Sequence, residues 1–332
     1  MTHPVLESLL RRCVLHDGGE PDAALIEASQ AFVQAAHADP ALLREAALAA
    51  ESLPVRGAGF LAILVGGAIE RGADAQPSFD PFWRILLACC EPEPVDARRA
   101  MLLDTGLRML GRSLVSHLAR LPQQRAALLD DAAFDRVKRL SAEQVGAFWV
   151  CEAIERGSAD LLLLHAPSRR GWRARYENVA QCFHLFSLLQ SAVGTTLPGG
   201  RQVDPALAAA ARGETHGQVL HDQAWWHYQV AGPTTPDAMA MVPGDLLTRH
   251  LPAVDGAQVL VLWDPILAGR GWSSEFFGAH LMQLPASFEL REPLSDDESS
   301  SWFKRLGFAE PAQASPPMPG SATRKRPWWR PF

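Results

Sequence analysis

The stretch that decides the fold is ADLLLLHAPSRRGWRARYENV, residues 159–179. It begins with a short apolar run of the length of a buried strand, and turn-forming residues follow at Pro167. From residue 172 onward, large and charged side chains alternate. One face would carry Trp172, Ala174 and Tyr176, and the other Arg173, Arg175 and Glu177. Because a period of two residues is characteristic of β-structure, the stretch predicts a β-hairpin.

Upstream of this hairpin the pattern is helical. Between residues 95 and 121 leucines recur at steps of three and four, which lines one face of a long helix. Two glycines, Gly106 and Gly111, interrupt that helix and would cost stability unless a neighbouring helix packs closely against them. We therefore expect residues 1–157 to form an α-helical domain.

A short internal similarity suggests one form for this domain. AILVGGAIERGAD (62–74) resembles AFWVCEAIERGSAD (147–160) at an offset of 85 residues. This offset is near two units of a helical solenoid, whose repeats span about 40–47 residues. Two unrelated amphipathic, alanine-rich helices would explain the similarity equally well, so a solenoid is one option for residues 1–157.

Downstream of the hairpin, strands and helices are mixed. AQVLVLWDP (257–265) predicts a strand buried on both faces, and ASFELREPL (286–294) predicts an alternating one. Asp204 and Ser295 stand at the starts of two short predicted helices, and Ser295 forms a capping box with Glu298. We expect a mixed α+β domain over 158–308, and an α+β, predominantly helical fold for the whole chain.

The last segment, 309–332, is rich in Pro, Ser and Ala and has no apolar period, which predicts a disordered tail. It ends in TRKRPWWRPF, where cations and aromatic rings are interleaved. Tryptophan and arginine are frequent anchors of protein interfaces, so a protein partner is expected here, with contact to a membrane surface as a lesser alternative. The residues predicted to bind are Arg324, Arg326, Trp328, Trp329, Arg330 and Phe332.

Composition narrows the functional classes. The 332 residues carry a formal net charge of −6, which does not favour nucleic acid as a partner. Neither a signal peptide nor a transmembrane segment is recognisable. The five cysteines are odd in number and form no CxxC, which is typical of a reducing compartment. Much alanine and few lysines indicate a GC-rich bacterial genome, so we expect a bacterial cytoplasmic protein.

A histidine-rich segment, ETHGQVLHDQAWWHYQ (214–229), raises the question of a metal site. Its possible ligands are His216, His221 and His227. On a strand, six residues span roughly 20 Å, too far for one ion, so no metal and no cofactor is favoured. We expect instead a strand with Trp225 and His227 on one face and with Trp226 and Tyr228 on the other.

A catalytic site would have to be assembled from distant segments. His165 and Asp264 end two predicted strands, which is where α/β proteins place chemistry, and His221–Asp222 could join them as a general base. Hydrogen bonding within loops is the favoured interpretation of these residues.

The hairpin offers a second predicted partner-binding cluster, made of Arg169, Arg170, Trp172, Arg173 and Arg175. In a chain of net negative charge, a solvated strand face with stacked guanidinium groups is the favoured alternative for these residues. The sequence therefore favours an interaction or adaptor protein without catalytic activity. The alternative is a hydrolase, with or without a metal, that uses histidines and aspartates of the mixed domain.

Overall fold

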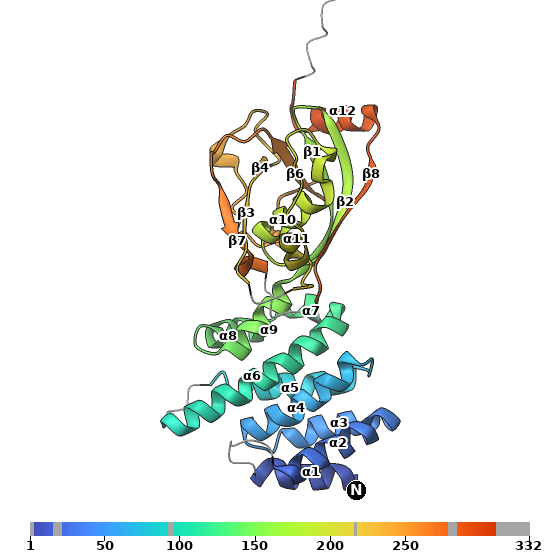
Figure 1. Cartoon of the computed structure of the whole chain (residues 1–332), viewed down its shortest axis with the longest axis vertical. Coiled ribbons are helices and arrows are strands. Elements are labelled where there is room, and N and C mark those ends of the chain that lie inside the picture. Colours follow the sequence, from blue (N-terminus) through green and yellow to red (C-terminus); the bar gives the residue numbers. More distant parts are fainter. Residues whose placement is uncertain (1–2, 16–21, 92–95, 216–217, 278–283, 310–332) are drawn as a thin grey trace, which may run out of the picture.

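The computed structural model describes residues 3–15, 22–91, 96–215, 218–277 and 284–309. The fold is α+β and predominantly helical, as predicted. Helices make up the chain as far as Glu155, which we call the helical half, and a β-sheet with a few helices follows from Gly157, which we call the sheet half (Figure 1). The predicted tail from residue 310 onward, with its six partner-binding residues, lies outside the described residues.

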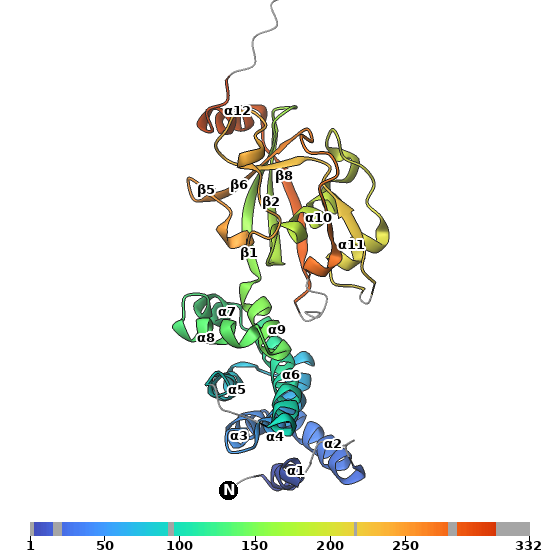
Figure 2. The ribbon, with the colours of Figure 1, turned by 90° about the vertical axis from the view of Figure 1, so that its left-hand side faces the viewer.

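From α2 to α7, the helices of the helical half alternate between two layers along the chain. Figure 2 shows α2, α4, α6 and α9 in one layer and α3, α5, α7 and α8 in the other. This alternation is the arrangement seen in helical solenoids. The bounds are α1 (Pro4–Leu15), α2 (Ala23–Ala38), α3 (Ala41–Ala50), α4 (Val55–Glu70), α5 (Gln76–Ala88), α6 (Ala97–Arg120), α7 (Pro122–Leu128), α8 (Ala132–Ser141) and α9 (Val145–Glu155).

The two similar segments of the sequence fall on α4 and α9, which both pack against α6. Matching positions are buried in the two helices, for example Val65 with Val150 and Ile69 with Ile154. An internal repeat stays a prediction.

Glycines let α4, α6 and α9 come unusually close. A Cβ on Gly59 would overlap the backbone of Gly106, and one on Gly66 would meet Ser113, so α4 and α6 run in the same direction. On the other side of α6, a Cβ on Gly111 would overlap the carbonyl oxygen of Gly146. The close neighbours expected for Gly106 and Gly111 are therefore present.

His117 on α6 is a buried histidine with both ring nitrogens engaged. Its Nδ1 lies 2.7 Å from the carbonyl oxygen of Ser113, and its Nε2 lies 2.9 Å from Oγ of Ser78. A neutral ring satisfies both contacts, because Nδ1–H donates to the carbonyl and Nε2 accepts from the hydroxyl. Burial lowers the pKa of His117 to about 4.

We expect His117 to make the protein less stable in mild acid. In the unfolded chain histidine takes up a proton below its ordinary pKa of 6.5, whereas folded His117 stays neutral down to about pH 4. The unfolded state therefore gains about 2 kcal/mol from this residue between pH 7 and pH 5. Urea unfolding at both pH values measures the loss. A His117→Gln variant should show a loss about 2 kcal/mol smaller, and an unchanged loss would contradict the assignment.

The sheet half is built on one mixed sheet with strand order β4–β6–β1–β2–β8, and β5 adds to β6. β1 and β6 are parallel, and the other pairs are antiparallel. A separate small sheet joins β3 to β7. The bounds are β1 (Gly157–His165), β2 (Arg170–Val179), β3 (His221–Gln223), β4 (His227–Val230), β5 (Ala253–Val254), β6 (Ala257–Trp263), β7 (Gly271–Ser273) and β8 (Ser287–Pro293).

The sheet separates two hydrophobic cores. Leu260 and Leu262 of β6 belong to the core under α10 (Cys182–Val193) and α11 (Pro205–Ala211). Val259 and Val261 belong to the core under α12 (Asp296–Arg305) on the opposite, outer face. The predictions of a hairpin and of a strand buried on both faces are thus confirmed. The capping box of Ser295 and Glu298 is also confirmed, at the start of α12.

The prediction that the aromatic residues of the segment 214–229 lie on opposite faces of one strand is wrong. Trp225, Trp226 and Tyr228 all lie in one core, because the chain leaves β3 at Gln223 and enters β4, in the other sheet, at His227. The polar groups of the rings have partners outside this segment. Trp226 Nε1 donates to the carbonyl oxygen of Pro198 (2.9 Å), and the Tyr228 hydroxyl donates to Oε1 of Gln190 (2.6 Å).

The two halves meet at a buried arginine. Arg156, directly after α9, donates to the carbonyl oxygens of Asn178, Leu284 and Phe277 at 3.1, 2.9 and 2.6 Å. Asn178, the penultimate residue of β2, has a left-handed φ of 55°, and its side-chain Oδ1 accepts a bond from Arg125 of α7 (3.0 Å). Burial lowers the pKa of Arg156 to about 10. These bonds attach the end of the helical half to three separate segments of the sheet half.

Candidate functional site

The carboxyl ends of the parallel strands β1 and β6 bring together two of the predicted catalytic residues. His165 ends β1 opposite Arg170 of β2, and Asp264 directly follows β6. Burial lowers the pKa of His165, while the charge of Asp264 raises it and that of Arg170 lowers it further. Both residues lie at the strand ends, as predicted.

The third group at this edge, Ser168, was missed. Its Oγ lies 2.7 Å from Nδ1 of His165, across the turn at Pro167. In the sequence, the signal for this contact was a serine three residues after the histidine that ends the strand. The other ring nitrogen of His165, Nε2, is enclosed by protein, with no hydrogen-bond partner among the described residues. His165 therefore contacts Ser168 through one ring nitrogen, while its other ring nitrogen is enclosed by protein.

His221 and Asp222 do not join this edge. His221 is exposed on β3, whereas Asp222 faces α10 and accepts bonds from Ser187 (2.6 Å) and Gln190 (3.1 Å). Burial raises the pKa of Asp222 above its ordinary value, and the bonds from Ser187 and Gln190 offset part of this rise. With several donors directed at it, this carboxylate holds the small β3–β7 sheet against α10.

The predicted metal ligands are also dispersed. His227 is buried on β4, with Nε2 3.1 Å from the carbonyl oxygen of Asp237, and His221 is in the other sheet. His216 lies outside the described residues. In the part of the chain that the structure describes, no three His, Cys, Asp or Glu side chains are grouped to hold a metal ion.

The arginine–aromatic cluster of the hairpin is divided between the two faces of the sheet. Trp172 is buried under α10, with Arg170 stacked on its ring at 5.1 Å. Arg169 lies over Phe303 and Phe308 and donates to the carbonyl oxygen of Ala309. Only Arg173 and Arg175 project from the outer face of the sheet, away from Trp172, so these five residues do not form one exposed patch.

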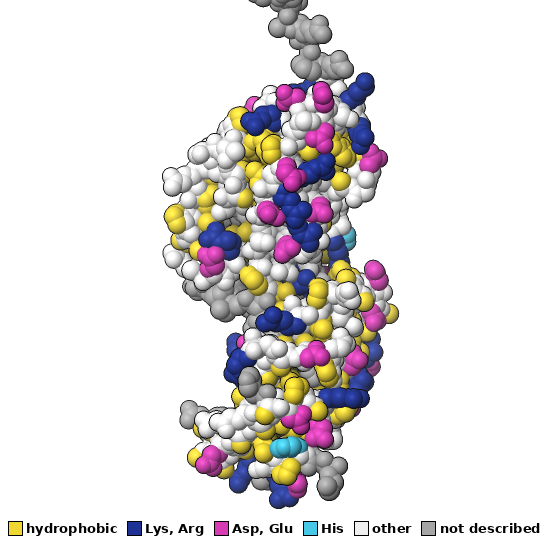
Figure 3. Space-filling view, turned by 90° about the vertical axis from the view of Figure 1, so that its right-hand side faces the viewer, with side chains coloured by type: hydrophobic (Ala, Val, Ile, Leu, Met, Phe, Trp, Pro, Cys, Tyr) yellow, Lys and Arg dark blue, Asp and Glu magenta, His cyan; other side chains and the backbone are white. Residues whose placement is uncertain are grey.

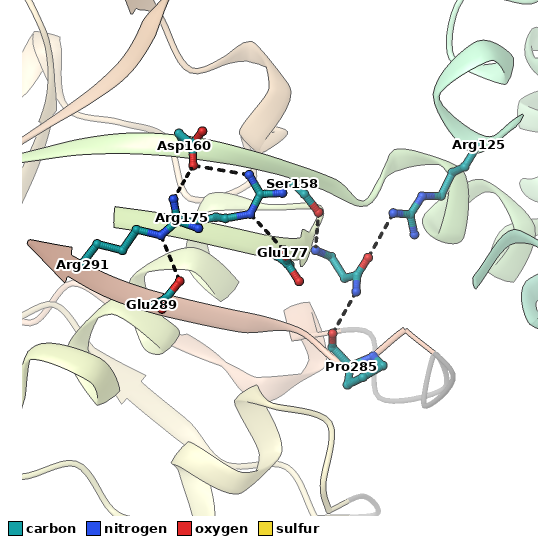
Figure 4. A network of polar contacts seen from close by, with 9 residues as sticks. Arg125, Ser158, Asp160, Arg175, Glu177, Pro285, Glu289 and Arg291 are labelled. Carbon is teal, nitrogen blue, oxygen red and sulfur yellow. Dashed lines mark hydrogen bonds and ion pairs between the residues drawn. The ribbon is translucent and has the colours of Figure 1, made fainter. Parts of the chain in front are cut away.

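The outer face of the sheet carries an ion-pair network (Figure 4). Asp160 accepts from Arg175 (3.3 Å) and Arg291 (3.2 Å), and these two arginines also bond Glu177 and Glu289. Arg173 pairs with Glu298 of α12 at 3.2 Å. Four carboxylates and three guanidinium groups give a net charge of −1, which disfavours a polyanion. Figure 3 shows cationic and anionic side chains interspersed on this side of the sheet half.

A different surface lies on the helical half. On α6, Met101, Thr105, Arg108 and Arg112 recur at steps of three and four, opposite the buried leucines. The guanidinium of Arg112 lies 5.3 Å from the ring of Trp149 on α9, so the two helices present these side chains on one side. We call this surface the three-helix face; it consists of Phe60, Ile63, Met101, Thr105, Arg108, Arg112, Phe148 and Trp149.

The three-helix face has the composition of a protein interface. Met101 is 59% exposed and Phe148 is 43% exposed. Methionine, aromatic residues and arginine are enriched where proteins dock, and large apolar side chains exposed together mark such sites. This face was not predicted from the sequence. The sequence did contain a signal for it, the pair Gly106 and Gly111. These glycines predicted close packing of neighbouring helices, but not the surface that those helices form together.

Comparison of the chain with protein-family models, with curated proteins and with solved structures found no match. Among the helices of the described residues, none has both the length and the apolar character needed to cross a bilayer.

Proposed function

We propose that the protein is a non-enzymatic interaction protein, an adaptor of the bacterial cytoplasm, which docks a protein partner on the three-helix face. The observation that carries the proposal is the exposure of Phe148, next in the chain to Trp149 and its Arg112 stack, together with that of Met101, about three turns before Arg112 on the same face of α6. Apolar and aromatic anchors next to arginine are the side chains that contribute most to binding energy at protein interfaces.

The form of the face also suits docking. The glycine contacts of α6 with α4 and α9 bring the three helices together, so their outward side chains make one continuous surface. Extended faces of this kind are the binding surfaces of helical solenoids. Arg112 adds a cationic group, which would select a partner segment with an acidic residue next to its apolar ones, whereas Arg108 is paired with Asp104 at 2.8 Å.

We expect Met101→Glu to reduce capture of the partner at least tenfold, because a charge would be placed in the apolar part of the interface. Full-length protein serves as bait, and the captured proteins are quantified by mass spectrometry. Leu48→Glu is the matched control, since Leu48 is 45% exposed on α3, in the other layer. Equal capture by both variants would remove the case for the three-helix face.

A deletion of residues 310–332 separates this proposal from docking by the predicted tail. Capture that survives the deletion and is lost in Met101→Glu supports the three-helix face. Capture that is lost only with the deletion assigns the partner to Arg324, Trp328 and the other tail residues.

A further inference from the structure

A small cavity opens on the outer face of the sheet beside α12, away from the three-helix face. Its volume is about 190 Å³, and its lining comes from β1, β2, β6, β8 and α12. This is the volume of about six water molecules, which suits a small metabolite rather than a macromolecule. The lining residues that matter are Asp160, Leu162, Arg173, Ala174, Arg291 and Trp302.

One wall of the cavity offers a hydrogen-bond acceptor. Asp160 is 72% exposed, and its bonds to Arg175 and Arg291 both go to Oδ1. Oδ2 makes no hydrogen bond among the described residues and is open to a donor that enters the cavity (Figure 4). An ammonium group is a charged donor, and its hydrogen bond to a carboxylate oxygen is stronger than one from a neutral donor.

Two guanidinium groups of the lining can donate hydrogen bonds to a ligand carboxylate. Arg173 and Arg291 both line the cavity, and the bond from Arg173 to Glu298 uses only one of its nitrogens, Nη2. Because a guanidinium carries five N–H donors, Arg173 has further donors for a ligand carboxylate. Leu162, Ala174 and the indole of Trp302 supply the apolar part of the lining.

We propose that this cavity binds a free, zwitterionic α-amino acid with an apolar side chain. Its ammonium group donates to Oδ2 of Asp160, its carboxylate accepts from Arg173 and Arg291, and its side chain packs against Leu162 and Trp302. A simple anion is disfavoured by the net charge of −1 on the surrounding network. A zwitterion has no net charge, so its binding leaves the network at −1. Its two charged groups pair with the carboxylate of Asp160 and with the guanidinium groups.

The test compares L-leucine with two analogues that each lack one charge, N-acetyl-leucine and leucinamide. Saturation-transfer NMR and isothermal titration calorimetry on the full chain should give a Kd for leucine of about 1 mM or below, and binding at least tenfold weaker for each analogue. The proposal is overturned if leucine fails to bind at about 20 mM, or if either analogue binds as well as leucine.

Variants tie the binding to the cavity. Asp160→Asn keeps the size of the side chain but weakens the ammonium contact, and leucine should bind at least tenfold more weakly. Glu177→Gln is the matched control, because Glu177 belongs to the same ion-pair network but does not line the cavity. Its affinity for leucine should equal that of the unchanged chain. Equal affinities in the two variants would place any leucine site elsewhere, against the proposal.

Discussion

Gly146→Ala should lower the free energy of unfolding by about 2 kcal/mol, although alanine is the better helix former. A Cβ on Gly146 would overlap the carbonyl oxygen of Leu107 on α6 and approach the backbone nitrogen of Arg108. Backbone cannot move aside as a flexible side chain can, so α9 must shift away from α6. Overpacking of this kind costs about 1–3 kcal/mol or more and outweighs the gain in helix propensity of about 1 kcal/mol.

Gly67→Ala on α4 is the matched control for this prediction. Among the described residues, a Cβ on Gly67 would meet only a terminal nitrogen of Arg71, at 4.0 Å. Here the propensity gain is unopposed, so stability should rise by up to about 1 kcal/mol. Urea unfolding of both variants measures the two effects. Two changes of the same sign would show that the contact of α6 with α9 is looser than described.

Arg156→Met is expected to cost about 3 kcal/mol of unfolding free energy. It leaves the carbonyl oxygens of Asn178, Leu284 and Phe277 without the donor that they share. Buried acceptors without a partner cost about 1–3 kcal/mol each, and relief from burying a cation offsets part of the sum. The expected loss should appear in urea unfolding followed by far-UV circular dichroism.

The same sequence motif supplies the control. Arg71 occupies the place of Arg156 in the other AIERG segment but is exposed after α4. Arg71→Met should therefore change stability by no more than about 0.5 kcal/mol. If both methionine variants unfold alike, the hydrogen bonds at the junction contribute no net stability.

These two arginines show where sequence reasoning ends. Periodicity and capping are local, so the hairpin of β1 and β2, the doubly buried β6 and the N-cap Ser295 could be predicted from a few neighbouring residues. Nothing in AIERG tells which copy is buried, because burial of Arg156 depends on Phe277 and Leu284, more than a hundred residues away.

The candidate sites, too, could be predicted only where they depend on local patterns. His165 and Asp264 could be placed together because both end strands, and the order of strands in mixed sheets is constrained. The predicted alternation of Trp225 to Tyr228 failed because a strand pattern cannot show that the chain changes sheets. The cavity draws on four strands and a helix, which only the tertiary fold brings together.

The position of β8 at the end of the sheet order bears on the behaviour of the protein at high concentration. An outermost strand presents backbone groups on which a further strand could add, which is the starting point of fibril growth. Here the strand carries Glu289, Arg291, Glu292 and Pro293, and its pairing with β2 is irregular near Trp172. Charges, a proline and a distorted ladder all oppose such addition, so the ion-pair network also protects the chain against aggregation through this edge.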